Sequence, residues 1–214
     1  MCYFVILLIA GSTFFGCNET NDSKSISGTT KQGLFKDAGT FSFSSNLGNF
    51  TANGVFDTLM ISSNAAGAFK YTQGTHSVIV VFAYNVASPL NAQIVWAGVI
   101  DTLNTTSTGS YSFAQIGTKI GIFGYFPNIA DTSANSTFYL LTSGSMNVAA
   151  LTATALSGTF SGNGVSVFDS TKTIAVTNGS YNTPIVEQYF SLDDGNVAVI
   201  QQRIKAEIKK HLQF

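Results

Sequence analysis

The chain has 214 residues, which suits one domain with a leader or at most two small domains. Apolar residues make up 45% of it, but charged residues only 10%, compared with about a quarter in an average globular protein. The net charge is −1, and the basic surface that nucleic-acid phosphates require is missing, so a nucleic-acid partner is not expected. Both cysteines, Cys2 and Cys17, lie in the first 17 residues. The rest of the chain therefore cannot form an internal disulfide or a thiolate metal site.

Residues 1–16 are predicted to be a signal peptide. The apolar run from Tyr3 to Ile9 is shorter than the roughly 20 residues that a membrane-spanning helix needs, and its length is typical of a signal-peptide core. The small Gly16 precedes Cys17, and the polar sequence NETNDSKS follows at once. This arrangement resembles a bacterial lipoprotein signal, which implies cleavage before Cys17 and acylation of that residue. The alternatives are a secreted protein without lipid, or a strand with a buried cysteine.

The chain after the leader divides into three parts. Residues 17–37 are polar and lack periodicity, which indicates a flexible tether. Residues 38–190 are expected to form one all-β domain. In residues 191–214, the apolar residues Val197, Ile200, Ile204, Ile208 and Leu212 have helical spacing. This pattern predicts a C-terminal amphipathic helix that covers a sheet edge or one end of a barrel, or else contacts a membrane surface or a partner.

The all-β prediction rests on short apolar runs separated by Gly, Asn and Ser. Thr40–Ser44 alternates strictly, and the runs His76–Asn85 and Ala92–Ile100 are long and apolar enough for central strands. Further strands are expected at Ser110–Ala114, Lys119–Phe126, Thr137–Thr142, Ser145–Leu151, Leu156–Ser161 and Lys172–Thr177. Asn53-Gly54, Asn163-Gly164 and Asn178-Gly179 are predicted to be hairpin turns. The expected fold is a single antiparallel β-sandwich or flattened β-barrel.

Several stretches resemble a family of uncharacterised lipoproteins from the Bacteroidetes. The main one is LSGTFSGNGVSVFDSTKTIAVTNGSYNTPI, residues Leu156–Ile185, and shorter ones are TGSYSF at Thr108–Phe113 and SGSMNV at Ser143–Val148. The resemblance covers residues 39–185 and implies an all-β lipoprotein at the cell envelope, with no activity attached. Secreted proteins of that group are similar to one another in carrying O-glycans at Asp-Ser/Thr motifs. By that resemblance, Thr58, Thr102 and Ser170 are candidate glycosylation sites.

Catalytic chemistry has little support in the sequence. The histidines are His76, at the start of an apolar run, and His211, among lysines in the tail. The body has four aspartates, Asp57, Asp101, Asp131 and Asp169, and each precedes Thr or Ser as in an Asx turn. We predict no catalytic site, no metal site and no cofactor. Trp96 is expected in the core, while Tyr111, Tyr125, Phe126 and Tyr139 are candidates for a carbohydrate platform.

Together these observations predict a non-enzymatic binding or scaffolding module at the cell envelope, anchored in the outer membrane through Cys17. Its partner would be a glycan or an envelope protein. The alternatives are a barrel that carries a small apolar ligand, and a hydrolase that uses His76 with an aspartate.

Overall fold

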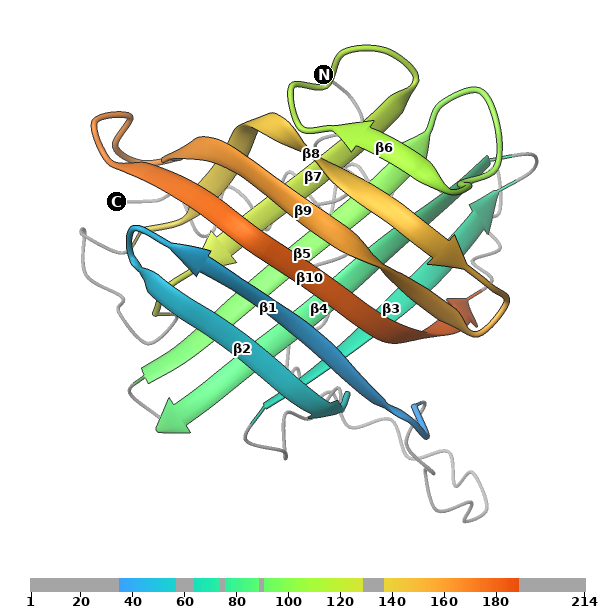
Figure 1. Ribbon diagram of the computed structural model, residues 1–214, viewed down its shortest axis with the longest axis horizontal. Coiled ribbons are helices and arrows are strands. Elements are labelled where there is room, and N and C mark those ends of the chain that lie inside the picture. Colours follow the sequence, from blue (N-terminus) through green and yellow to red (C-terminus); the bar gives the residue numbers. More distant parts are fainter. Residues whose placement is uncertain (1–34, 57–63, 74–75, 89–90, 129–136, 189–214) are drawn as a thin grey trace, which may run out of the picture. The chain divides into compact units, whose positions relative to one another are not determined.

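The computed structural model describes residues 35–56, 64–73, 76–88, 91–128 and 137–188, and the regular structure of this part is entirely β (Figure 1). The predicted signal peptide, most of the predicted tether, Thr58 and the expected C-terminal helix lie outside the described residues. The strands are β1 (Ala38–Ser45), β2 (Gly48–Val55), β3 (Asn64–Gln73), β4 (His76–Ser88), β5 (Asn91–Asp101), β6 (Gly109–Ser112), β7 (Lys119–Phe126), β8 (Tyr139–Leu151), β9 (Ala155–Ser166) and β10 (Thr173–Gln188).

The ten strands form one sheet that closes into an irregular, flattened ring in the order β1-β10-β9-β8-β6-β7-β5-β4-β3-β2. The all-β prediction is confirmed. Most neighbours are antiparallel, but β3 pairs in parallel with β10 and, at one position, with β2, and β6 pairs in parallel with β7. The sheet is therefore mixed, where the sequence predicted an antiparallel one. β8 is one strand with register shifts, where two strands were expected.

The ring has two sides, whose strands cross in Figure 1. We call β2, β1, β10, β9, β8 and β6 the polar layer, and β3, β4, β5 and β7 the apolar layer. Alternate residues of both layers point into the ring, as the period of a β-strand requires. The interior is filled by aromatic and aliphatic side chains; those of Phe41, Phe50 and Tyr111 are fully buried. The Phe160 ring lies 4.9 Å from that of Phe41 and 5.4 Å from that of Phe123, centroid to centroid, so rings from both layers meet at the centre.

Side chains form hydrogen bonds between the two pairs of neighbouring strands that share only one backbone pairing position, β2 with β3 and β6 with β7. Between β2 and β3, the Asn64 Oδ1 accepts a hydrogen bond from the Asn53 amide at 3.0 Å, and the Asn85 Nδ2 donates to the Thr51 carbonyl at 2.9 Å. Between β6 and β7, the Lys119 Nζ donates to the Thr108 carbonyl at 3.0 Å. These contacts satisfy backbone groups that would otherwise form an open strand edge.

The three Asn-Gly pairs were predicted to be hairpin turns, and this was wrong: they lie inside β2, β9 and β10. Asn178 has a φ of 52° and lies at a register shift, so Asn178-Gly179 forms a bulge in β10. A Cβ at Gly179 would collide with the Phe160 carbonyl oxygen and ring. Glycine is required at this position because another strand passes close to it.

The apolar layer is apolar on both faces. On its outer face Ala65, Tyr84 and Ile94 form a second buried cluster, with Phe56 packed against it. The Phe35 ring packs edge-on against Phe56 at 5.3 Å. Both faces of these strands are buried, which explains why β4 and β5 read as nearly continuous apolar runs.

Candidate functional site

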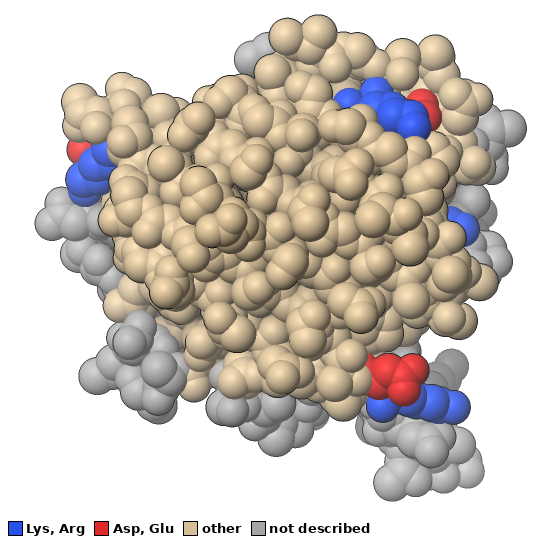
Figure 2. Space-filling view, in the orientation of Figure 1, with Lys and Arg blue, Asp and Glu red and all other residues tan. Residues whose placement is uncertain are grey.

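The outer face of the polar layer carries Ser, Thr and Asn side chains and no described charge. Between Ala38 and Val55, Gly109 and Ser112, and Tyr139 and Val186, the charged residues are Asp169 and Lys172, and both lie in the β9–β10 connection rather than in a strand. Near the end of β10, the side chain of Glu187 lies outside the described part. In Figure 2, which shows this side, the middle of the face is free of charged groups, and those that are visible lie at its margins. This face is the candidate functional site.

One outward-facing row of residues crosses all six strands of the polar layer in continuous register. Its members are Thr51 of β2, Ser42 of β1, Ser180 of β10, Thr159 of β9, Asn147 of β8 and Ser110 of β6. We call these six residues the central row. Five interstrand spacings of about 4.8 Å each give the row a length of about 24 Å. A second row of Asn53, Thr40, Asn182 and Ser157 runs beside it.

Most of the hydrogen-bonding capacity of the central row is unused. Its internal side-chain hydrogen bond joins the Ser42 and Ser180 hydroxyls at 3.0 Å. The side chains of Thr51, Thr159 and Asn147 are exposed and take part in none of the intramolecular hydrogen bonds found in the described ranges. A hydroxyl can both donate and accept, and an amide offers two donors and an acceptor. The exposed side chains thus offer donors and acceptors that complement a neutral ligand rich in hydroxyls. The described strand residues of the face include no cation for a phosphate or carboxylate, and the Lys119 ammonium lies at the β6 margin, where it donates to the Thr108 carbonyl.

Comparisons with protein-family models, with curated proteins and with solved structures found no match to this chain. The properties of the site therefore follow from its own residues.

The predicted tyrosine platform does not form, because its three tyrosines point into the ring. Tyr111, Tyr125 and Tyr139 are all buried in the interior. Burial raises the pKa of Tyr125 to about 12, and the neighbouring Tyr139 acts in the same direction. Phe126 lies on the outer face of the apolar layer, where its ring stacks on that of Phe138 at 4.2 Å.

Trp96 also lies on the outer face of the apolar layer and not in the interior where we expected it. It is half-buried, and its ring stacks on that of Phe138 at 6.0 Å. It covers Gly124, at which a Cβ would collide with the indole. The run around Trp96 is apolar because both faces of β5 are buried, so sequence alone could not place the indole inside or outside the ring.

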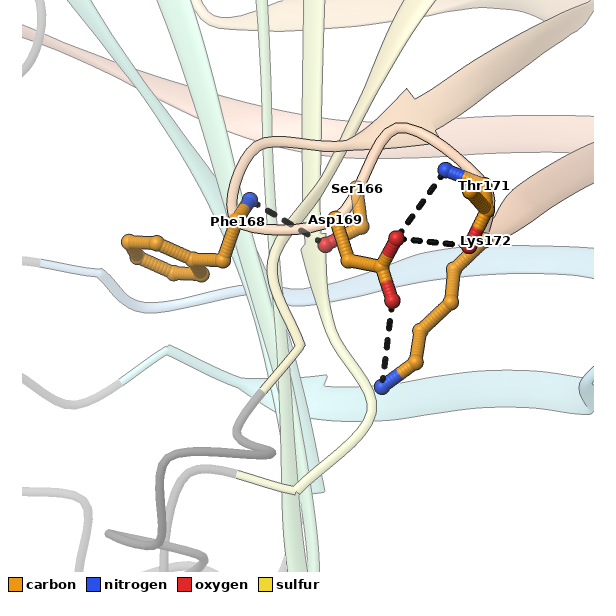
Figure 3. A network of polar contacts seen from close by, with 5 residues as sticks. All are labelled: Ser166, Phe168, Asp169, Thr171 and Lys172. Carbon is orange, nitrogen blue, oxygen red and sulfur yellow. Dashed lines mark hydrogen bonds and ion pairs between the residues drawn. The ribbon is translucent and has the colours of Figure 1, made fainter.

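Ser170, a candidate glycosylation site, is exposed in the β9–β10 connection, which is held by a compact network of polar contacts (Figure 3). The Asp169 Oδ1 accepts hydrogen bonds from the Thr171 amide at 3.0 Å and from its hydroxyl at 2.6 Å. The Lys172 Nζ lies 4.0 Å from the Asp169 Oδ2. The expected Asx turn is confirmed here. In the same connection Val167 and Phe168 are 52% and 68% exposed, and the Phe168 amide donates to the Ser166 hydroxyl at 3.3 Å.

The Asp169 turn is expected to loosen in acid. The Thr171 side-chain hydrogen bond, followed by that from its amide, lowers the pKa of Asp169 below its ordinary value of 3.8. A lowered pKa means that the turn is fully stabilised above the ordinary value and loses that stabilisation as the pH falls through the folded-state value. The Thr171 amide resonance, followed by NMR, should shift over that range. In Asp169→Asn, which keeps an acceptor but cannot titrate, the shift should vanish; if it persists, Asp169 is not its cause.

The other predicted site residues are not brought together. The Asp101 Oδ1 accepts hydrogen bonds from the Leu103 and Asn104 amides, both at 3.1 Å, which is again a turn. Thr102, the second glycosylation candidate, is half-buried, and its hydroxyl donates to the Thr118 carbonyl at 3.3 Å. His76 begins β4 opposite Gln73, and its side chain lies outside the described part. Asp57 and Asp131 lie there too.

The described residues contain neither a cluster of metal ligands nor a membrane-spanning helix. No three of their His, Cys, Asp and Glu side chains lie close enough together to hold a metal ion. Nor do those residues include a helix whose length and hydropathy would let it cross a bilayer.

Proposed function

We propose that this chain is a lipid-anchored protein of the cell envelope, in the outer membrane, which binds a neutral polysaccharide through the outer face of its polar layer. The observation that carries the proposal is the uncharged central row with its unused donors and acceptors. Carbohydrate hydroxyls are neutral and both donate and accept hydrogen bonds, which makes them complementary to such a surface. The lipoprotein-like leader ending at Cys17 supports the location.

Binding without catalysis has more support than the hydrolase alternative. Asp101 and Asp169 each use a carboxylate oxygen to hold a local turn. General acid–base catalysis requires such groups to face a reacting atom from a cleft. The carrier alternative has less support as well, because side chains such as Phe43, Phe123 and Phe160 occupy the interior of the ring.

The anchor is tested by the intact mass of the protein purified from the membrane fraction of its native host. We expect the mass of residues 17–214 with added acyl chains, because acylation of Cys17 follows cleavage before it. A Cys17→Ser variant is the control, and it should lack both the cleavage and the lipid. A mass that begins at Met1, or a cleaved chain without lipid, would contradict the anchor.

Mass spectra of proteolytic peptides from the same preparation test glycosylation at Thr58, Thr102 and Ser170, which stays a prediction. Peptides that contain Ser170 should carry added hexose-range mass more often than those with Thr102, because the Thr102 hydroxyl is hydrogen-bonded and half-buried. Peptides without added hexose mass at all three positions would contradict the prediction of glycosylation.

The binding itself is tested by electrophoresis of the whole chain through gels that contain a neutral or an anionic polysaccharide. The neutral polymers should retard the protein, while anionic polymers should not, because the described strand residues of the face include no cation to pair with them. Equal mobility in every gel would contradict the proposal.

A further inference from the structure

We infer that the ligand of the polar layer is an extended chain of sugars lying across the strands along the central row, with a site about as long as the row. This inference deepens the proposed function and rests on it.

The direction of the sugar chain across the strands follows from the part of the layer in which the strand register is continuous. On one side of the central row, register shifts lie between Ser42 and Ser44 and between Val176 and Gly179. On the other side, the β8–β9 register shifts between Val148 and Ala150. The central row passes between these irregularities. Among the outward-facing rows of the described strands, this row has a member on each of the six strands of the layer. A ligand across the strands therefore meets one polar side chain per strand.

The spacing along the row fits a sugar chain. Neighbouring strands lie about 4.8 Å apart, whereas same-face residues along one strand lie about 6.8 Å apart. The smaller of these spacings is close to the length of one hexopyranose unit in an extended β-linked chain. Each sugar unit of a chain that lies across the strands thus meets the next side chain of the row. For a chain that lies along one strand, the length of a sugar unit would not match the spacing of the side chains.

The ends of the row set the length of the site. Thr51 is on β2 and Ser110 on β6, and beyond each of these strands the layer ends at a place bridged by side chains. The row therefore offers six positions over about 24 Å, measured along the sheet. Affinity should rise with the number of sugar units until the row is full and should then stay constant.

The test uses β-1,4-linked gluco-oligosaccharides of two to eight units and the whole chain, with binding measured by calorimetry. A neutral hydrogen bond contributes about two- to tenfold in affinity, so we expect the hexamer to bind at least tenfold more tightly than the dimer. The octamer should bind no more tightly than the hexamer. Affinity that is equal for all lengths, or that still rises at eight units, would overturn the row as the site but leave polysaccharide binding standing. If no oligomer binds and no neutral polysaccharide retards the protein, both proposals fail.

A matched pair of asparagines tests the row directly. Asn147 belongs to the central row and Asn182 to the second row, and both side chains are exposed. Asn147→Ala should weaken binding of the hexamer two- to tenfold, while Asn182→Ala should change it less than twofold. The Asn147 carbonyl that accepts from the Tyr181 hydroxyl is kept in the variant, so the fold should be unaffected. Equal losses in the two variants would overturn the assignment to the central row.

Discussion

Replacing Phe160 by alanine is expected to lower the free energy of unfolding by about 3–5 kcal/mol, as for other buried phenylalanines. Phe160 is 4% exposed, and its ring lies within 4.9–6.3 Å, centroid to centroid, of four other rings. Two of these, Phe41 and Phe43, come from β1, and Phe123 comes from the apolar layer. The cavity would therefore form where the two layers meet. Because small domains are stable by only about 5–15 kcal/mol, the loss should be large in a urea titration.

The control for this variant is the next residue back along the same strand. Thr159 faces outward and its side chain makes no hydrogen bond within the described structure, so Thr159→Ala should change the stability by less than about 0.5 kcal/mol. The two variants thus separate the inner from the outer face of β9. Equal losses for Phe160→Ala and Thr159→Ala would mean that the side chains do not alternate as described.

Placing a charge in the central row should abolish most binding. Thr159 is the fourth of the six residues of the row, and Thr159→Arg would put a hydrated guanidinium beneath a neutral ligand that has no group to pair with it. Burying an unpaired charge is costly, so we expect at least about a tenfold loss of affinity for the neutral polysaccharide that binds best. Electrophoresis through gels that contain that polymer, or calorimetry, measures the loss.

The matched charge control lies outside the strands of the polar layer. Thr105 is exposed in the β5–β6 connection, and its side chain makes no hydrogen bond within the described structure. Thr105→Arg adds the same charge to the chain but should leave binding unchanged. A loss in both variants would point to net charge rather than to the central row, and no loss in either would place the binding surface elsewhere.

Several features of the fold could be predicted from local sequence because they depend on local physics. Strict alternation in Thr40–Ser44 placed Phe41 and Phe43 on one face, and both are indeed buried together in the ring. Aspartate before Thr or Ser predicted Asx turns, which Asp101 and Asp169 form. In each case the interaction spans only a few residues, so the pattern is visible in one short stretch.

Other features were misread because they depend on distant strands. The glycines of the Asn-Gly pairs are needed where another strand approaches, as the Phe160 carbonyl approaches Gly179, and no local pattern separates that need from a turn. Trp96 lies in a strand buried on both faces, so alternation did not tell the inside from the outside. Tyr111, Tyr125 and Tyr139 point inward because strand pairing places their positions on the inner face of the sheet.

The sequence by itself determined that this is a β-protein with a weakly charged surface of Ser, Thr and Asn, because composition and short-range alternation do not depend on how the strands are arranged. It could not tell that Thr51, Ser42, Ser180, Thr159, Asn147 and Ser110 form one row. These residues are scattered over more than a hundred positions of the chain. Only the pairing of the strands brings these residues side by side. A one-residue shift in the register of a strand would turn its side chains to the opposite face of the sheet.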